Sequence, residues 1–241
     1  MQYLGGKSQT ARVIADLLTP ADPTARVFIP FAGGLSDSAA IAKLLGPSAV
    51  SRLKVSDAAK PLVDLYSALR AGWEPDPVGE DNYQSFKIRA KAGDFSPQVV
   101  WAGIACSFGG KWMAGLARNS RGDSYHDRAL RSIRRKLASL GDTPIECRDF
   151  REISPQAGDR AYLDPPYAGS TGYPIAPTWG PRDTEDLWAW ASAAAARGCK
   201  VLVSEYAAPE GWIGSPLAKS RLSVSRGGMA RQDMLWTKEE T

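Results

Sequence analysis

The sequence predicts an α/β protein built on a doubly wound, Rossmann-like sheet. Short apolar runs at 26–30, 53–56, 159–163 and 200–204 have the length expected of buried strands, and segments with helical spacing of apolar residues lie between them. A glycine turn at Gly33-Gly34 separates the first run from the first helix, in the order typical of a nucleoside-binding unit. A chain of 241 residues is long enough to bury a sizeable core around such a sheet.

The first unit consists of a strand at 26–30, the turn Phe31-Ala32-Gly33-Gly34 and a helix at 36–45. We expect Ser36 to cap this helix, because a serine hydroxyl can accept a hydrogen bond from a backbone N–H of the first turn. Gly46-Pro47 should end it. The turn is not a G-x-G-x-x-G fingerprint, so a nucleoside without phosphates fits better than a dinucleotide, with a plain strand-to-helix turn as the alternative.

The second unit is a strand at 53–56 that ends on Asp57, followed by a helix in which Leu62, Leu65 and Leu69 share a face up to Ala71-Gly72. Asp57 lies 24 residues beyond Gly33. An acid at that spacing, at the end of the second strand, is the one that binds ribose hydroxyls in doubly wound nucleoside-binding folds.

A change in composition at 73–77 predicts an insertion. We therefore divide the chain into one domain of residues 1–73 and 149–241 and an inserted subdomain of residues 74–148. The last part of the insertion, 126–140, is predicted to be a helix with Leu130, Ile133, Leu137 and Leu140 on one face and arginines on the others. His126 is expected to cap this helix or to face solvent.

After the insertion the α/β pattern returns, with a strand at 159–163, a helix at 184–197, a strand at 200–204 and a terminal hairpin that pairs 220–225 with 232–237. The three cysteines, Cys106, Cys147 and Cys199, have no close spacing, so we expect reduced and mostly buried thiols rather than disulfides or a metal site. Neither a signal peptide nor a membrane span is indicated, which predicts a cytosolic protein.

The positive charge is concentrated in one segment. The chain carries a net charge of +4, but residues 111–136 hold eight basic and two acidic side chains, so the remainder of the chain is at −2. This distribution is typical of a nucleic-acid contact. The alternative is that Arg128, Arg131, Arg134 and Arg135 only solvate the outer face of the predicted helix.

Asp164-Pro165-Pro166-Tyr167 follows the strand at 159–163 directly. Two prolines fix the backbone there, so a carboxylate, a carbonyl oxygen and an aromatic ring should all project from the carboxyl end of the strand. Asp164 and the Pro165 carbonyl could accept both protons of an exocyclic amine and free its lone pair, while Tyr167 stacks on the base. The alternative is a proline-rich turn with a capping aspartate.

Four segments together resemble the Dam-like DNA adenine methyltransferases. In family order they are Tyr3-Leu4-Gly5-Gly6-Lys7, then 28–36, then Ser56-Asp57 with 62–66, then 164–167. The resemblance implies a Rossmann-like AdoMet-dependent methyltransferase sheet with a small, mostly helical target-recognition insertion. It also implies transfer of a methyl group from S-adenosyl-L-methionine (AdoMet) to the N6 amine of adenine in double-stranded DNA, with the base flipped out of the duplex. S-adenosyl-L-homocysteine (AdoHcy) would be the product, and no metal is required.

The resemblance assigns roles residue by residue. Asp164, Pro165 and Tyr167 would form the catalytic set, and Asp164 would also border the cofactor. The cofactor would be bound by an N-terminal pair, a loop at its methionine portion, an acid at its ribose and a pair beside its adenine: Tyr3 and Lys7; Phe31, Ala32 and Gly33; Asp57; Asp149 and Phe150. The resemblance is weakest in the central segment, where the DNA-contact candidates are Lys111, Arg118, Asn119 and Arg121.

Several alternatives stay open at this level. Methylation of cytosine N4 in DNA, of adenine in RNA or of a protein amide would use equivalent chemistry, and a catalytically silent DNA-binding relative would keep the fold. Methylation at a ring carbon of cytosine is disfavoured, because the Pro-Cys pair that supplies the nucleophile in such enzymes does not occur in this sequence. The recognised site, a companion restriction enzyme, a phage or orphan role and the oligomeric state are not specified by these residues.

Overall fold

The computed structural model describes residues 10–20, 22–118, 125–167, 174–217 and 233–238. Within them, seven strands form a single sheet in the order β3-β2-β1-β4-β5-β7-β6. The strands are β1 (Val27–Ile29), β2 (Leu53–Asp57), β3 (Ile145–Cys147), β4 (Arg160–Leu163), β5 (Lys200–Glu205), β6 (Ile213–Pro216) and β7 (Met234–Thr237).

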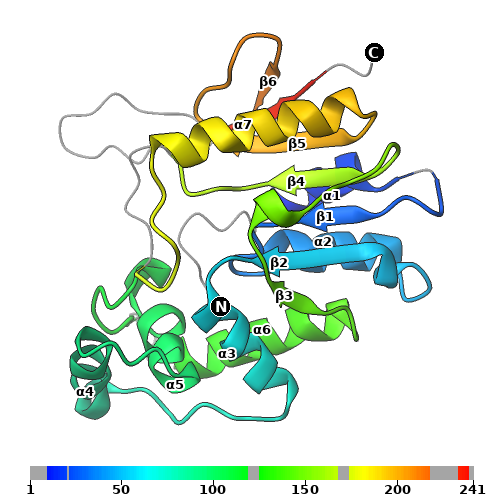
Figure 1. The fold of residues 1–241 in the computed structure, drawn as a ribbon. Helices are drawn as coiled ribbons and strands as arrows, with labels where there is room; N and C mark the ends of the chain where they lie inside the picture. The colour runs from blue at the N-terminus through cyan, green and yellow to red at the C-terminus, as the bar shows by residue number, and fades with distance from the viewer. Residues whose placement is uncertain (1–9, 21, 119–124, 168–173, 218–232, 239–241) are drawn as a thin grey trace.

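Strands β1 to β5 are parallel to one another, and β7 runs antiparallel to both β5 and β6. Because parallel strands end on the same side, the loops that follow β1 to β5 all lie at one edge of the sheet (Figure 1). We call this the carboxyl edge.

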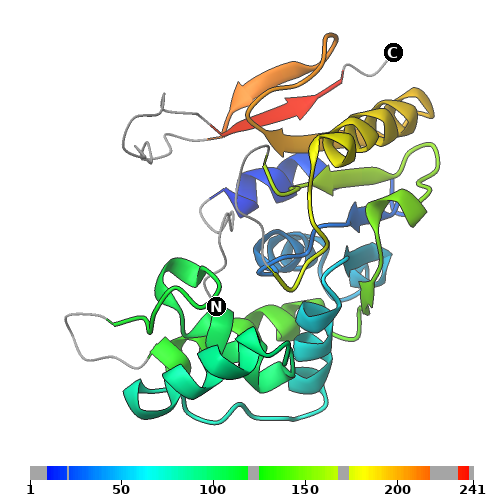
Figure 2. The ribbon, with the colours of Figure 1, turned by 60° about the vertical axis from the view of Figure 1, so that its left-hand side comes forward.

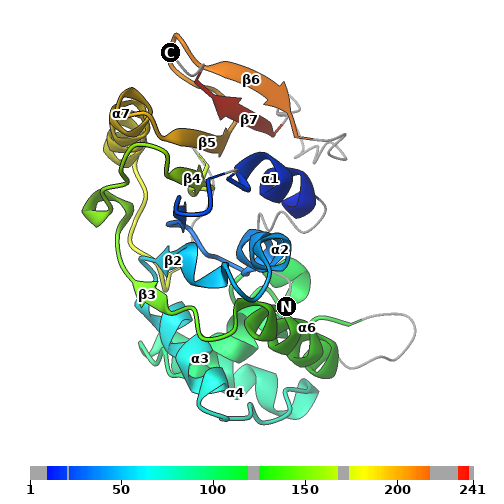
Figure 3. The same cartoon turned by 90° about the vertical axis from the view of Figure 1, so that its right-hand side faces the viewer.

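Side chains that alternate along the strands point to opposite faces of the sheet, and both faces are buried. Val27 and Ile29 join one core, whereas Phe28 between them packs with Ile153, Ala161 and Trp190 on the other face. The first core also contains residues of α1 (Ala11–Leu18), α2 (Ser36–Leu45), α3 (Lys60–Arg70) and α6 (Tyr125–Leu140). The opposite face is covered by α7 (Pro181–Ala196), and Figure 3 shows α1 and α7 on opposite sides of the sheet. The sheet is therefore doubly wound, as predicted.

The predicted strand and helix flanking the glycine turn are confirmed, and the helix spans 36–45 as predicted, but its capping differs from the expectation. The residue that precedes α2 is Leu35, which adopts a left-handed conformation with φ of 57°. Ser36 lies inside the first turn, and its hydroxyl accepts a hydrogen bond of 2.9 Å from Lys136 Nζ. The expectation that Ser36 caps the helix was wrong, because its oxygen is engaged by a side chain from α6.

The segment between α3 and α6 contains α4 (Glu80–Lys91), α5 (Pro97–Val100), a π-helical turn at Trp101–Ala105 and a 3-10 turn at Phe108–Gly110. It has a small core of its own, formed by Tyr83, Phe86, Val99, Ala102 and Met113. Figures 1 and 2 show α4 at the end of the molecule opposite β6 and β7.

The end of the predicted insertion, residue 148, does not coincide with the point where the sheet resumes. Strand β3 pairs with β2 through Val55–Ile145 to Asp57–Cys147, so residues 145–147 are part of the sheet. Helix α6 contributes Ile133 and Leu137 to the main core. The sequence did not reveal β3 because it is an edge strand with exposed or half-buried side chains, without the apolar run of a central strand.

One further expectation needs correction, and the expectation of free, mostly buried cysteines is confirmed. His126 neither caps α6 nor faces solvent: it is 7% exposed, and its Nδ1 accepts a hydrogen bond of 3.0 Å from Trp101 Nε1. Cys106 and Cys199 are buried as expected, but Cys147 is exposed on the edge strand.

At the C-terminal end, 234–237 forms a strand as predicted, whereas its proposed partner at 220–225 lies outside the described residues. The neighbours of β7 are β5 and β6. Among the described helices, none has the length and apolar content to cross a bilayer.

Candidate active site

The candidate residues of the domain formed by 1–73 and 149–241 that the structure describes all lie at the carboxyl edge. Phe31, Ala32 and Gly33 follow β1, Asp57 ends β2, Asp149 and Phe150 follow β3, and Asp164 to Tyr167 follow β4. Segments as far apart as 31 and 167 in the chain therefore share one edge. Tyr3 and Lys7 lie outside the described residues.

Asp57 holds the glycine turn in place. Its Oδ2 accepts a hydrogen bond of 2.9 Å from the backbone N–H of Gly33, and its Oδ1 accepts one of 2.9 Å from Ala59. Burial raises the pKa of Asp57, and these two hydrogen bonds oppose that rise. A carboxylate offers about four lone-pair positions, so both oxygens retain acceptor capacity for a ligand hydroxyl.

The turn is fixed from two more sides. The N–H of Ala32, which is buried, donates to the Ser56 carbonyl at 2.9 Å, and the Tyr66 hydroxyl donates to the Gly33 carbonyl. The conformation of the turn is thus set by β2 and α3 before any ligand binds.

Lys136 is a site residue that sequence analysis missed. It was counted within the basic segment, but its Nζ turns inward from α6 and donates to the Gly34 carbonyl as well as to Ser36 Oγ. Burial lowers the pKa of Lys136 to about 8, and the nearby carboxylate of Asp37 opposes this fall. No sequence signal distinguishes Lys136 from the arginines beside it, because the contact joins residues 102 apart.

Three aromatic rings pack together beside the turn. Phe31 lies 5.6 Å from Phe150 and 5.7 Å from Trp179 between ring centroids, and Phe150 lies 6.0 Å from Trp179. Phe150 is fully buried, whereas Phe31 and Trp179 are half-buried. Sequence analysis selected the two phenylalanines but not Trp179, which lies 15 residues beyond Asp164, just before α7.

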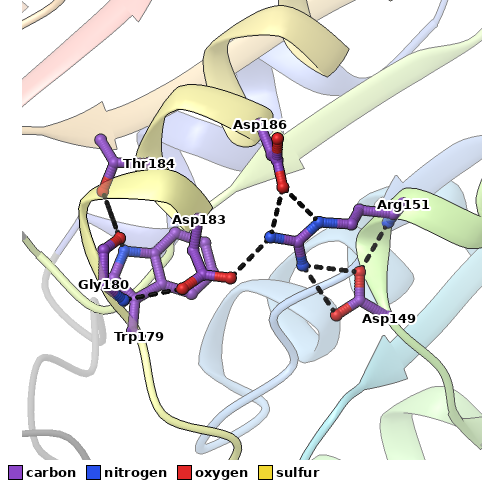
Figure 4. A network of polar contacts seen from close by, with 7 residues as sticks. All are labelled: Asp149, Arg151, Trp179, Gly180, Asp183, Thr184 and Asp186. Atoms are coloured by element: carbon purple, nitrogen blue, oxygen red, sulfur yellow. Dashed lines mark hydrogen bonds and ion pairs between the residues drawn. The ribbon is translucent and has the colours of Figure 1, made fainter.

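Asp149 is engaged by Arg151, as Figure 4 shows. Asp149 Oδ1 accepts hydrogen bonds from Arg151 N at 2.9 Å and from Nη1 at 3.2 Å. The same guanidinium also bonds to Asp183 at 2.6 Å and to Asp186 at 2.9 Å, both on α7.

Asp164 and Tyr167 lie at the end of β4, with Pro165 buried between them. The Tyr167 ring packs edge-on against Tyr206 with centroids 4.7 Å apart. Burial, together with the charge of Asp164, raises the pKa of Tyr167, so its phenol stays protonated at neutral pH. Tyr206, which directly follows β5, is another residue that sequence analysis missed, although its place after a predicted strand could have indicated it.

Ser204 links the β4 and β5 ends. Its Oγ shares a hydrogen bond of 2.7 Å with the Tyr162 hydroxyl, and both groups are buried. Burial, and then the charges of Asp164 and Asp37, raise the pKa of Tyr162 well above its usual value. The Tyr162 hydroxyl therefore stays protonated at neutral pH.

The basic segment is less uniform than its composition suggests. Lys111 is exposed, whereas Arg118 forms an ion pair of 2.9 Å with Glu80, and Arg134 pairs with Glu74. Asn119 and Arg121 lie outside the described residues. Arg128, Arg131 and Arg135 project from the exposed side of α6. No group of three or more potential metal ligands occurs among the residues that the structure describes.

Five parallel strands, an antiparallel β7 inserted between β5 and β6, and helices on both faces define the Rossmann-like methyltransferase fold class that the sequence predicted. Among solved structures, the chain is similar to TrmN from Thermus thermophilus, with a TM-score of 0.37 and 15% identity over 95% of this chain. The chain spans about half of that protein, 48% of its length.

It is also similar to the rRNA methyltransferase aviRa from Streptomyces viridochromogenes, with a TM-score of 0.35 and 15% identity, covering 95% of this chain and 84% of the other. No protein-family model and no curated protein matches the sequence.

Proposed function

We propose that this protein is an AdoMet-dependent methyltransferase that acts on the exocyclic N6 amine of adenine in DNA. The observation that carries the proposal is the position of Asp164-Pro165-Pro166-Tyr167 at the carboxyl end of β4, on the same edge as the Gly33 turn and Asp57. In doubly wound folds this edge binds the nucleoside ligand. The segment 164–167, which would activate the adenine amine, and the Gly33 turn, which would bind AdoMet, therefore lie on the same edge of the sheet.

The residues at the carboxyl edge suit the proposed cofactor. Asp57 keeps acceptor positions for ribose hydroxyls, Asp149 is an acceptor for a purine amine, and Phe31 offers an aromatic surface. The absence of a G-x-G-x-x-G fingerprint agrees with a ligand that lacks phosphates. When bound, AdoMet supplies an electrophilic methyl group on a positively charged sulfur.

The chemistry proposed for this chain is activation of a weakly nucleophilic amine. The Asp164 carboxylate and the Pro165 carbonyl accept the two amine hydrogens, which localises the nitrogen lone pair. Tyr167 contributes a ring face to the base, and Tyr206 packs against the Tyr167 ring in a T-shaped contact. The protein supplies position and electrostatics, and no covalent nucleophile is needed.

We assign the DNA contact to the basic side chains of this segment that are exposed and form no ion pair with a carboxylate among the described residues. Glu80 and Glu74 offset Arg118 and Arg134, and Lys136 is turned inward, which leaves Lys111 and the exposed side of α6. Arg128, Arg131 and Arg135 are spaced at i, i+3 and i+7, so they share one helix face. Such a row of guanidinium groups is suited to phosphates of a nucleic-acid backbone.

The test is methyl transfer from labelled AdoMet to unmethylated duplex DNA, followed by nucleoside analysis of the product. We expect N6-methyladenine from the wild-type protein. For Asp164→Asn we expect a loss of at least about 10²-fold in rate, because the amide carries no negative charge to offset the positive charge that develops on the amine nitrogen. AdoHcy binding should persist in that variant. Asp142→Asn, an exposed carboxylate between α6 and β3, is the control with the same chemical change and should retain activity.

Each other outcome contradicts a stated part of the proposal. N4-methylcytosine, or transfer only to RNA, would replace the substrate. AdoHcy binding without transfer to any nucleic acid would indicate a silent relative, and full activity of Asp164→Asn would remove Asp164 from the mechanism.

A further inference from the structure

Arg151 forms the centre of the polar network in Figure 4. It lies two residues after Asp149, in the 3-10 turn Phe150–Glu152 that follows β3. Its backbone N–H and its Nη1 both donate to Asp149, while Nε and Nη2 face the α7 carboxylates of Asp183 and Asp186. One side chain thus connects the end of β3 to the start of α7.

Arg151 also orders the aromatic rings next to Asp149. Its guanidinium lies over the Phe150 ring, 4.5 Å from the centroid, and Phe150 packs on Phe31 and Trp179. Asp183 uses its other oxygen to accept the Gly180 N–H at 2.7 Å, which fixes the residue that follows Trp179. Arg151 therefore contacts, directly or through one neighbour, the end of β3, the three aromatic rings and the start of α7.

The charge balance makes this arrangement dependent on the guanidinium. Three carboxylates surround a single positive side chain, so loss of that charge would leave like charges facing one another. Burial by itself lowers the pKa of Arg151, but the hydrogen bonds that it donates to Asp183 and Asp186, together with the charge and hydrogen bond of Asp149, outweigh burial and raise the pKa. A lysine could not replace it fully, because an ammonium lacks the planar set of donors that reaches three partners at once.

The hydrogen bonds on Asp149 leave room for a ligand. Arg151 occupies Oδ1 through two donors and reaches Oδ2 through Nη1 at 3.2 Å. A carboxylate has about four lone-pair positions, so at least one position remains, and its direction is set by the Arg151 fork.

We propose that Arg151 is a positioning residue that orients the Asp149 carboxylate toward the exocyclic amine of the adenine in AdoMet and AdoHcy. This inference rests on the proposed function, since it presupposes that the nucleoside of the cofactor lies at the carboxyl edge. It assigns Arg151 a role in recognition of the purine amine, in addition to the contacts by which it connects β3 to α7.

The experiment compares two ligands by calorimetry: AdoHcy, and its purine-riboside analogue in which hydrogen replaces the amine. We expect Arg151→Gln to weaken AdoHcy binding about tenfold and to leave binding of the analogue within about twofold of wild type, because the analogue has no amine for Asp149 to accept. The AdoHcy affinity of Arg151→Lys should lie between those of wild type and Arg151→Gln. The double variant Arg151→Gln with Asp149→Asn should bind AdoHcy no more weakly than Asp149→Asn alone, since both act through one contact.

Arg148→Gln is the matched control. Arg148 lies three residues earlier and pairs with Glu146 and Glu152, and its removal changes the net charge equally. We expect wild-type affinity for both ligands in this variant. Thermal unfolding of each variant accompanies the titrations, and Arg151→Lys keeps the comparison possible if Arg151→Gln does not fold.

Two results would overturn the inference while leaving the proposed function standing. One is AdoHcy affinity of Arg151→Gln and Arg151→Lys equal to that of Arg148→Gln. The other is an equal loss for AdoHcy and for its analogue, which would make Arg151 a structural residue. By contrast, failure of the wild-type protein to bind either ligand would overturn the proposed function, and the inference with it.

Discussion

At the scale of single residues, the carboxylates of the candidate site are held by contacts that the sequence cannot reveal. Sequence spacing predicted Asp57 as a ribose acceptor, but its oxygens are shared with the N–H groups of Gly33 and Ala59. The hydrogen bond to Gly33 links residues 24 apart and depends on how β1 and β2 align. Spacing predicted Asp57 and the family resemblance predicted Asp149 as carboxylates of this site, whereas the donors that orient them became visible only in the structure.

Lys136 allows a test of the inward contact under the glycine turn. Since its pKa in the folded protein is lowered to about 8, the unfolded chain binds more protons than the folded chain between about pH 8 and 10.5. The contribution of Lys136 to stability must then rise with pH across that range. We expect the difference in unfolding free energy, wild type minus Lys136→Met, to increase from pH 7 to 9.5 in urea titrations.

The neutral amine formed at high pH keeps donors for Gly34 and Ser36, so deprotonation does not remove these contacts. Lys43→Met, which changes an exposed lysine of α2, serves as the control. A difference that stays constant from pH 7 to 9.5 for Lys136→Met would show that the ammonium is not desolvated.

At the scale of elements, apolar periodicity predicted most of the helices that pack against the sheet, but it missed α1, whose Ile14 and Leu18 belong to the main core, and it failed where a segment packs against itself. The helices that became α2, α3, α6 and α7 were predicted within a few residues. The segment from 78 to 116 was predicted only as an insertion, because its short helices and turns bury residues from several directions and show no single period. The antiparallel strand β6 was not predicted, for the same reason as β3: most of its side chains are exposed, so it lacks an apolar run.

The junction between α6 and the π-helical turn depends on His126. Phenylalanine in its place would preserve ring volume but leave the buried Trp101 Nε1 without its acceptor. An unsatisfied buried donor costs about 1–3 kcal/mol, and we expect His126→Phe to lose that much stability in urea unfolding. His126→Asn, whose amide oxygen can take the place of Nδ1, should lose less. A Phe variant as stable as wild type would show that the hydrogen bond contributes nothing net.

The exposed face of α6 gives a prediction about the proposed DNA contact. If Arg128, Arg131 and Arg135 each neutralise a phosphate, replacing all three by Gln should weaken binding to duplex DNA and reduce the slope of log affinity against log salt by about 3. Lys43, Lys54 and Arg197 form the charge-matched control, because they lie on other elements, and their replacement should leave the slope unchanged. Equal slopes for the two triple variants would assign the α6 arginines to solvation alone.

At the scale of the whole molecule, the candidate site exists only in the folded sheet, because segments that begin near residue 31 and end near residue 206 contribute to one edge. A ligand that binds this edge must therefore stabilise the entire domain against unfolding. The stabilisation follows from mass action and amounts to about 2.7 kcal/mol at a ligand concentration of 100 times Kd. For a chain of this length that corresponds to a rise in Tm of about 5–10 °C.

We expect AdoHcy to produce this rise in wild type, and a smaller one at the same concentration in Asp57→Asn. The amide has only one acceptor oxygen, so it cannot hold both Gly33 and Ala59 and also receive a ribose hydroxyl. Scanning calorimetry with and without AdoHcy measures both shifts, and Asp64→Asn, an exposed carboxylate on α3, controls for the charge. If AdoHcy raised the Tm of wild type and of Asp57→Asn equally, the ligand would bind away from the glycine turn. The hydrogen bond between Asp57 and Gly33 would then have no part in cofactor binding.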